Sequence, residues 1–182
     1  MTLLISIEAE CATMVPKAFM VKDIRQTGSY GSDPEYLVNF NGMLYFSAGE
    51  DGCGYELWKS DGTREGTLIA KDANPGADNF YPRGLKITGD TLYFTNTTAL
   101  WKSDGTEIGT FLVKDFPLFA PDSLTEIDEI LYFRLETKEH GLELWRSDGT
   151  EAGTFIVKDI YTGSESGIPV PDFTVVNNTV YS

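Results

Sequence analysis

The feature that most constrains the fold of this chain is a motif that occurs three times and contains all three of its tryptophans. The motif reads Leu-Trp-Lys/Arg-Ser-Asp-Gly-Thr, and Trp58, Trp101 and Trp145 are spaced 43 and then 44 residues apart. Repeats of this length are typical of solenoids and propellers, in which each unit needs its neighbours to bury an apolar face. We therefore predict an array of similar units.

Each repeat contains four short apolar segments bounded by glycine, proline, asparagine and aspartate. In the first repeat they are residues 36–40, 43–47, 55–59 and 67–72, and the pair Asn41-Gly42 separates the first two. Asn-Gly between two apolar runs indicates a hairpin, because both positions of a type I′ turn have positive φ. Short segments rich in β-branched and aromatic residues are typical of strands. We predict an all-β fold, a β-propeller-like array of four-stranded antiparallel blades, with an open stack of hairpins as the alternative.

The sequence predicts three full units and a split, partial unit at each end of a repeat domain that spans 19–182. The full units cover about residues 35–72, 84–115 and 123–160. Residues 19–24 look like a fourth strand and residues 172–182 like a first and second strand, whereas 1–18 form an irregular segment or an improvised strand. We expect either a piece of a longer repeat protein or a ring of four blades in which the two ends complete one blade.

The chain is strongly acidic, with a formal net charge of −14. This charge disfavours nucleic acid and anionic membranes, because both are bound through clustered lysine and arginine. No apolar run approaches the roughly 18 residues of a membrane-spanning helix, so we expect no membrane insertion. The first ten residues lack the basic region of a secretory signal. Two cysteines, Cys11 and Cys53, make no disulfide framework.

Because the motif occurs once per unit, we interpret its residues as structural rather than catalytic. The aspartate can accept hydrogen bonds from backbone N–H groups two residues on, and the glycine adopts a backbone shape that other residues resist. One tryptophan per unit suggests packing between neighbouring units. The structural residues are Trp58, Asp61, Gly62, Trp101, Asp104, Gly105, Trp145, Asp148 and Gly149. The Lys-Asp pair that ends each unit is interpreted as polar protection of an edge strand.

Binding residues are expected in the segments that differ between repeats, since ligand sites usually lie on variable loops held by a rigid scaffold. These segments are 47–54, 95–98 and 134–141, together with the connections 73–84, 116–123 and 161–171. The ligand-binding candidates, mostly exposed aromatic residues, are Tyr30, Glu50, Asp51, Phe80, Tyr81, Phe119, His140 and Tyr161. No catalytic residue is predicted, because the chain has a single histidine and no spacing selects a pair of carboxylates.

No cofactor is predicted, and no residue is assigned to a metal site. Calcium is kept as an alternative, since acidic loops such as Glu50-Asp51 and Asp78-Asn79 offer the hard oxygen ligands that this ion prefers. No stretch of the sequence matches the loop pattern of an EF-hand or the nonapeptide calcium repeat. The sequence therefore favours no particular set of calcium ligands.

Residues 56–72, 99–115 and 143–160 follow the pattern Glu-Leu-Trp-Lys-Ser-Asp-Gly-Thr-x-x-Gly-Thr-x-x-Val-Lys-Asp-Ile. This pattern resembles the bacterial ELWxxDGT repeat family. The second copy departs from it at Ala99 and Phe116, and the first at Ala70 and Ala73. The resemblance implies a large secreted or cell-surface protein with β-propeller-like repeats and no established catalytic activity.

We therefore expect a non-catalytic repeat scaffold or binding module from a larger extracellular bacterial protein. It would act in adhesion or recognise an unknown protein or glycan ligand through its variable loops. Open blade edges suggest self-association. The alternatives are a glycan-processing, sialidase-like propeller enzyme, which needs facing carboxylates and an arginine cluster in one pocket, and a calcium-binding structural repeat.

Overall fold

The computed structural model describes residues 20–26, 30–73, 79–159, 174–176 and 179–181. Every regular element in these residues is a β-strand, and no helix is present among them. Consequently the described part of the chain contains no helix with the length and apolarity needed to cross a membrane. The prediction of an all-β fold is confirmed.

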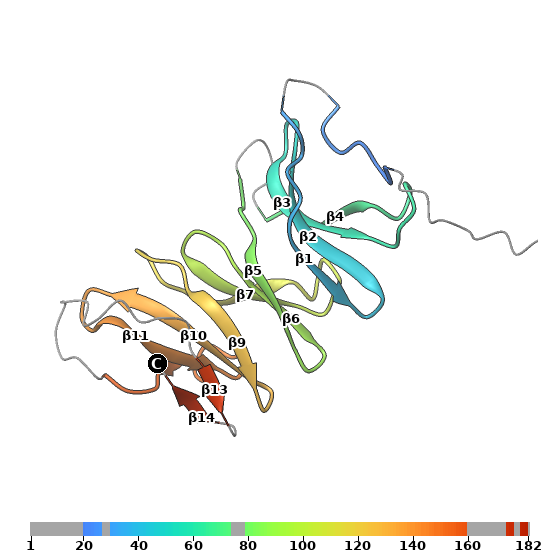
Figure 1. The fold of residues 1–182 in the computed structure, drawn as a ribbon. Coiled ribbons are helices and arrows are strands. Elements are labelled where there is room, and N and C mark those ends of the chain that lie inside the picture. Colours follow the sequence, from blue (N-terminus) through green and yellow to red (C-terminus); the bar gives the residue numbers. More distant parts are fainter. Residues whose placement is uncertain (1–19, 27–29, 74–78, 160–173, 177–178, 182) are drawn as a thin grey trace, which may run out of the picture.

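The strands form three four-stranded sheets and one separate hairpin (Figure 1). The first sheet contains β1 (Glu35–Phe40), β2 (Met43–Glu50), β3 (Gly54–Ser60) and β4 (Leu68–Lys71). The second contains β5 (Arg83–Thr88), β6 (Thr91–Thr95), β7 (Ala99–Ser103) and β8 (Phe111–Asp115). The third contains β9 (Asp122–Ile127), β10 (Ile130–Thr137), β11 (Gly141–Ser147) and β12 (Phe155–Ile156). The hairpin contains β13 (Thr174–Val176) and β14 (Thr179–Tyr181).

Within each sheet the strands pair antiparallel in chain order, which confirms the predicted four-stranded unit. The three sheets follow one another across the molecule, and their first strands lie side by side, β1 next to β5 and β5 next to β9 (Figure 1). The sheets do not close into a ring in the described residues. The structure thus has repeated antiparallel sheets, whereas a propeller arrangement is not confirmed.

The turn between the first two strands of the first sheet forms as the sequence predicts. Asn41 and Gly42 both have positive φ, 53° and 79°, as a type I′ turn requires. In the third sheet Asp128 and Glu129 take the same shape, with φ of 51° and 62°. The backbone N–H of Glu129 donates to the carboxylate of Glu126 at 2.9 Å, and this local bond supports the unusual conformation.

A residue with positive φ occurs near the start of the first strand in all three sheets, although the residue type differs between them. Tyr36, Gly84 and Ser123 occupy the same position near the start of the first strand of each sheet, and their φ values are 56°, 58° and 53°. The strand register shifts at these positions, as in a β-bulge. Because three chemically different residues adopt one conformation, the surrounding sheet imposes the bulge and the local sequence does not signal it.

Several strand boundaries differ from the prediction. Strands β2 and β3 continue to Glu50 and from Gly54, and β10 and β11 continue to Thr137 and from Gly141. The predicted variable loops 47–54 and 134–141 are therefore mostly strand, and only three residues turn the chain in each. The described part of the predicted fourth strand 19–24 contains no strand, although it packs on the first sheet. The extended pairing of β2 with β3 and of β10 with β11 is not visible in the sequence, because polar residues lie at the ends of these strands.

The core lies between successive sheets, because each sheet buries one face against the sheet that follows it. The cluster between the first and second sheets consists of Phe40, Tyr45, Leu57, Ala70, Phe80, Leu92 and Phe94. The cluster between the second and third sheets contains Tyr93, Leu100, Val113, Phe116, Leu131, Phe133 and Leu135. Full burial of one such leucine or phenylalanine contributes about 1.5–3 kcal/mol, so the sheets stabilise one another.

Candidate functional site

The Ser-Asp-Gly-Thr loop between the third and fourth strands is held by its own side chains. In the second sheet the Asp104 carboxylate accepts hydrogen bonds from the backbone N–H and the hydroxyl of Thr106, at 2.8 and 2.7 Å. The hydroxyls of Ser103 and Thr110 are 2.6 Å apart and connect the two ends of the loop. The first and third sheets repeat this arrangement with nearly identical distances.

These hydrogen bonds keep the aspartates of the motif ionised. Donation from the neighbouring threonine hydroxyl and N–H lowers the pKa of Asp61, Asp104 and Asp148 below the usual value. The second glycine of the motif makes room for each carboxylate, since a Cβ on Gly109 would overlap the Asp104 carboxylate. The aspartate oxygens that accept hydrogen bonds within the loop therefore have a structural role.

The glycine carbonyl of the loop also joins one sheet to the next. The hydroxyl of Tyr45 and the ammonium group of Lys59 both donate to the carbonyl oxygen of Gly105, at 3.1 and 3.2 Å. Tyr45 and Lys59 are opposite one another on β2 and β3. We call this arrangement, a tyrosine and a cation of one sheet on the motif glycine of the next, the glycine clasp.

The same pair recurs between the second and third sheets. Tyr93 and Lys102 are opposite one another on β6 and β7. A Cβ on Gly149 would overlap the Tyr93 hydroxyl and would lie 3.3 Å from the Lys102 nitrogen. The motif glycine is thus required by contact with the neighbouring sheet as well as by its positive φ.

The lysines of the Lys-Asp pairs form a second connection between units. Lys22 donates to the carbonyl of Thr67 at 2.7 Å, and its nitrogen lies 5.4 Å from the centre of the Trp58 ring. Lys114 contacts the third sheet in the same way, at 2.7 Å from the carbonyl of Thr154 and 5.8 Å from Trp145. For these two lysines the interpretation as edge protection is wrong, because each binds the following unit.

Each tryptophan packs against an apolar side chain of the segment that enters its sheet. Ile24 packs with Trp58, and the ring of Phe116 meets Trp145 edge-on at 5.7 Å. Phe80 meets Trp101 edge-on at 4.9 Å and is only 2% exposed. The prediction that Phe80 is an exposed aromatic residue is therefore wrong. Its burial follows from Ala73, which is too small to fill the space that Ile24 and Phe116 fill in the other units.

Of the predicted ligand-binding residues, Tyr81 lines a hollow that the structure forms from several segments. Its ring stacks on Tyr55 with the ring centres 5.4 Å apart, and the Arg83 guanidinium lies over the Tyr81 ring, 5.4 Å from its centre. The Tyr55 hydroxyl is 3.2 Å from Asp33. Two adjoining hollows of ≈ 370 and ≈ 380 Å³ share Tyr36 and Arg83.

We call these two adjoining hollows the tyrosine groove. Its walls come from the starts of β1, β5 and β9, from the chain that leads into them, and from single residues of β2, β3 and β6. The residues that line it include Asp33, Glu35, Tyr36, Tyr55, Tyr81, Arg83, Asp122 and Leu124. Sequence reasoning missed Tyr36, Tyr55 and Arg83, because they lie within or beside predicted strands, and the bulge that turns the strand start is not visible in the sequence.

The other predicted ligand-binding residues do not line this groove. Tyr30 and Phe119 are exposed, and Asp51 pairs with Arg25 at 3.1 Å. His140 lies 2.8 Å from Asp159, and Glu50 ends strand β2. Tyr161 lies outside the described residues. The structure therefore brings only Tyr81 of this set into the tyrosine groove, and the binding roles of the others stay predictions.

The described residues contain no cluster of three or more histidine, cysteine, aspartate or glutamate side chains that could hold a metal ion. Arg83 lines the groove, and Arg134 pairs with the lining residue Asp122 at 2.7 Å, so no arginine trio lines the groove in the described residues. The calcium and sialidase-like alternatives have no assembled residue set in the described part of the chain, and both stay predictions.

The glutamate that begins the longer repeat pattern is buried in the first and third sheets, as Glu56 and Glu143. Glu56 on β3 is fully buried, and its carboxylate accepts one long bond, from the N–H of Ala73 at 3.4 Å. Burial, with a smaller contribution from the charge of Asp72, raises the pKa of Glu56 to about 8. The second sheet has Ala99 at this position, so the fold does not require a carboxylate there.

The comparisons with known proteins give no relative for this chain. No protein-family model matches the sequence, and no curated protein matches it either. The resemblance to the ELWxxDGT repeats therefore stays a prediction that is based on the motif residues themselves.

Proposed function

We propose that this chain is a non-catalytic, β-propeller-like repeat scaffold of an extracellular bacterial protein, and that it recognises a glycan ligand. The observation that carries the proposal is the threefold repetition of the motif with the same internal hydrogen bonds. The aspartate of the motif accepts hydrogen bonds within the loop, and the motif glycines Gly105 and Gly149 contact the preceding sheet. Recognition is therefore assigned to surfaces that differ between the units, as in other repeat scaffolds.

The propeller arrangement is supported by the order of the strands. Chain order runs from the first strand of each sheet outward to the fourth, and the first strands of the three sheets are neighbours. In a propeller the first strands surround the central axis. The tyrosine groove lies where these strands begin, which is the place at which a propeller ligand would approach the axis.

The chemistry of the tyrosine groove favours a neutral carbohydrate. Tyrosine rings present flat apolar surfaces on which the C–H faces of a sugar ring can stack, and their hydroxyls provide polar contacts. Glu35 adds acceptors for sugar hydroxyls, and so do the carboxylate oxygens of Asp33 and Asp122 that are not engaged by Tyr55 and Arg134. The same carboxylates, on a chain of net charge −14, would repel an acidic sugar.

The proposal is tested by calorimetric titration with cellohexaose and with hexagalacturonate. We expect the wild-type chain to bind the neutral oligosaccharide and not the acidic one. Tyr36→Ser should weaken this binding at least about tenfold, which corresponds to about 1.4 kcal/mol. The fold should tolerate this substitution, since Ser123 has the same backbone conformation at the same position of the third sheet.

The matched control is Tyr30→Ala, which removes an exposed tyrosine outside the groove and should bind like the wild type. If Tyr36→Ser binds as strongly as Tyr30→Ala, the groove is not the binding site. If cellohexaose does not bind, the proposal fails for this neutral glycan, and binding of hexagalacturonate instead would contradict the expected preference for a neutral sugar.

A further inference from the structure

Among the residues that the structure describes, no neighbouring sheet covers one face of the first sheet or one face of the third, whereas the equivalent faces are covered elsewhere. On the first sheet, Leu37 and Leu44 are 59% and 37% exposed. The residues equivalent to Leu44 in the other two sheets, Leu92 and Leu131, are 0% exposed because the preceding sheet covers them. The first sheet therefore displays an apolar face that its counterparts bury.

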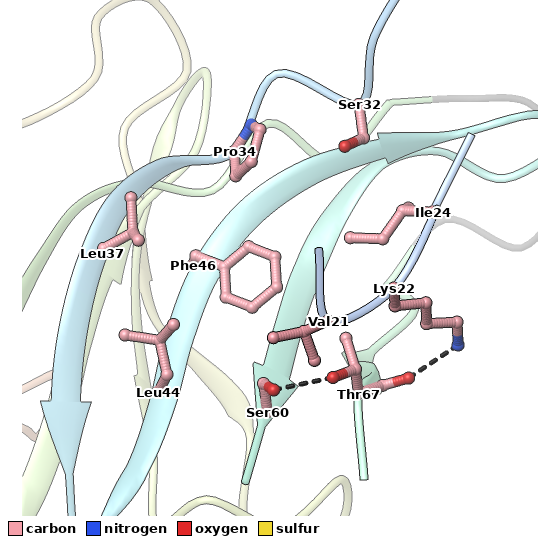
Figure 2. A pocket seen from close by; sticks show the side chains of 10 residues that line it. All are labelled: Val21, Lys22, Ile24, Ser32, Pro34, Leu37, Leu44, Phe46, Ser60 and Thr67. Carbon is pink, nitrogen blue, oxygen red and sulfur yellow. Dashed lines mark hydrogen bonds between the residues drawn. The ribbon is translucent and has the colours of Figure 1, made fainter. Parts of the chain in front are cut away.

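This face is hollowed into a groove of ≈ 190 Å³ (Figure 2). Leu37, Leu44 and Phe46 line it from the sheet, and Val21 and Ile24 lie across from them. We call it the docking groove. Lys22 borders it, with its nitrogen on the carbonyl of Thr67, as Figure 2 shows. Residues 21–24 thus make the contact that the fourth strand of a preceding sheet makes elsewhere in the molecule. The surface that the other strands of a preceding sheet would cover, which includes Leu37 and Leu44, is exposed.

The motif glycine of the first sheet is open in the same way. No heavy atom lies within 4 Å of the position of a Cβ on Gly62. In contrast, Tyr45 and Tyr93 closely approach the equivalent glycines, Gly105 and Gly149. Gly62 therefore has the positive φ of the other two, +88°, without the tyrosine and cation that complete the glycine clasp.

The third sheet has the complementary surface. Val157 is 45% exposed, whereas its equivalents Ala70 and Val113 are 5% and 6% exposed because the following sheet covers them. Tyr132 and Arg146 are opposite one another on β10 and β11, the positions that Tyr45 and Lys59 occupy in the first sheet. The Nε atom of Arg146 is buried and has no hydrogen-bond partner among the described residues.

We propose that two copies of this chain associate head to tail, with the third sheet of one copy packed on the docking groove of the other. Tyr132 and Arg146 of the first copy hold the Gly62 carbonyl of the second, as Tyr45 and Lys59 hold Gly105 within one chain. Arginine serves in place of lysine here, because the contact needs only a cationic N–H donor at the end of a long side chain.

This packing requires that Lys158 of one copy replaces Lys22 of the other at the first sheet. Lys158 is exposed, and it has the sequence position in the third sheet that Lys114 has in the second. On association Val157 and Lys158 of the first copy take the places of Val21 and Lys22 of the second, so the segment 20–24 leaves the groove. One lysine–carbonyl bond and one valine contact replace equivalent ones, so the favourable contribution comes from the newly covered Leu37 and Leu44 and from the completed clasp.

The contact is heterologous, because the groove and the back of the third sheet are different surfaces. Such contacts extend into chains of copies or close into a ring. The net charge of −14 opposes the approach of two copies, and added salt screens this repulsion. Association is therefore expected to strengthen as salt is raised from about 0.15 to 0.5 M.

Sedimentation velocity over a concentration series tests the proposal. We expect the wild type to form species larger than a monomer, whereas Leu44→Asp in the groove and Val157→Asp on the third sheet each abolish association. An equimolar mixture of these two variants should form a 1:1 dimer that does not grow, since each retains one intact surface. Ile108→Asp, at a site that is 97% exposed, is the control and should associate like the wild type.

Two further variants are informative. One distinguishes loss of the clasp from loss of folding, and the other tests whether the hairpin β13–β14, rather than the third sheet, occupies the docking groove. Tyr132→Phe removes one hydroxyl and should weaken association about fivefold while the circular dichroism spectrum is unchanged. Val180→Asp changes the hairpin β13–β14 and should have no effect. A wild type that is monomeric at every concentration overturns the proposal. So does a loss of association in Val180→Asp but not in Val157→Asp, which would make the hairpin the occupant. Tyr36→Ser should associate normally, so this test is independent of glycan binding.

Discussion

A single aspartate in each unit determines the shape of the motif loop, because it satisfies its own neighbours. Thr106 gives both its N–H and its hydroxyl to Asp104, and the N–H of Gly109 bonds to the Thr106 hydroxyl at 2.9 Å. The carboxylate occupies the space next to Gly109 where another residue would have its Cβ. The glycine that follows the Ser-Asp-Gly-Thr run is therefore as important to the loop as the aspartate.

We predict that Gly109→Ala displaces the Asp104 carboxylate and breaks its bonds to Thr106. The melting temperature should fall by about 2–4 °C or more, as expected for the loss of a local network in a chain of this size. Gly31→Ala is the control, because its new Cβ would be no closer than 3.4 Å to any other atom. Equal melting temperatures for the two variants, measured by circular dichroism, would show that the carboxylate has free space.

Glu56 gives the chain a specific dependence on pH. Its folded-state pKa of about 8 is higher than its ordinary value of 4.5, so the folded state binds the proton more tightly than the unfolded state. The stabilisation is complete below about pH 4.5 and is lost as the pH rises through about 8. Glu56→Gln, which mimics the protonated acid, should remove this part of the pH dependence.

The measurement is urea unfolding at pH 5, 7 and 9. Relative to Glu56→Gln, the wild type should lose up to about 4 kcal/mol of unfolding free energy across this range, which is an upper limit from the shift in pKa. Glu65→Gln, which changes an exposed carboxylate, serves as the control. If the Gln variant has the same pH profile as the wild type, Glu56 does not titrate in this range.

At the scale of strands and loops, the glycine clasp determines how one sheet meets the next. Tyr45 and Lys59 project from paired strands to a single carbonyl oxygen. Because two donors converge on Gly105, the angle and spacing between sheets depend on this loop as well as on the apolar core. The array therefore has polar contacts of defined geometry between its units, besides non-directional apolar packing.

Gly62 and Gly105 allow the contribution of the clasp to be isolated. Both have strongly positive φ, +88° and +92°, so Gly→Ala costs about 1 kcal/mol of backbone strain at either position. At Gly105 the new Cβ would also lie 2.6 Å from the Tyr45 hydroxyl. We predict that Gly105→Ala is about 1–2 kcal/mol more destabilising than Gly62→Ala in chemical denaturation of the monomer.

Combining Gly105→Ala with Tyr45→Phe provides a further check. Removing the hydroxyl relieves the overlap, so the double variant should be less destabilised than the sum of the two single variants. If the losses of unfolding free energy in the two single variants add up to that of the double variant, the Tyr45 hydroxyl does not contact this loop closely. A larger effect at Gly62 than at Gly105 would contradict the assignment of the clasp.

The strands and their order could be predicted from the sequence, because alternating apolar residues and the Asn41-Gly42 turn are local signals. The shared structural position of the motif could be predicted too, from its repetition. What the sequence does not signal depends on contacts between units. Phe80 is buried because Ala73 leaves a space beside Trp101, and Tyr36 enters the groove because of a bulge that Gly84 and Ser123 share. Neither fact is present in a single repeat.

At the scale of the whole molecule, stability should be highest in the middle. The second sheet is covered on both faces by its neighbours, whereas within the described part of the chain the first and third sheets each have one face that no other sheet covers. In a repeat array the terminal units open first, since each is held by one interface only. We predict that amide hydrogens of β6 and β7 exchange more slowly than those of β2, β3, β10 and β11.

Hydrogen exchange with mass spectrometry, at a concentration where the chain is monomeric, measures this order. Peptides from the motif loops of the second and third sheets provide an internal comparison, because both loops contact a preceding sheet. Uniform protection across the three sheets would mean that they unfold as one cooperative unit. Faster exchange in the second sheet would contradict the two-sided packing.

The clasp also gives the array a direction. Every internal boundary presents a tyrosine and a cation on one side and a motif glycine on the other, whichever two units meet there. A gene duplication that inserts one more module of about this length would thus create a new boundary of the same kind and leave the existing ones intact. Such a chain can lengthen or shorten by whole modules during evolution without any compensating substitution, and the groove at the start of its first strands can diversify separately.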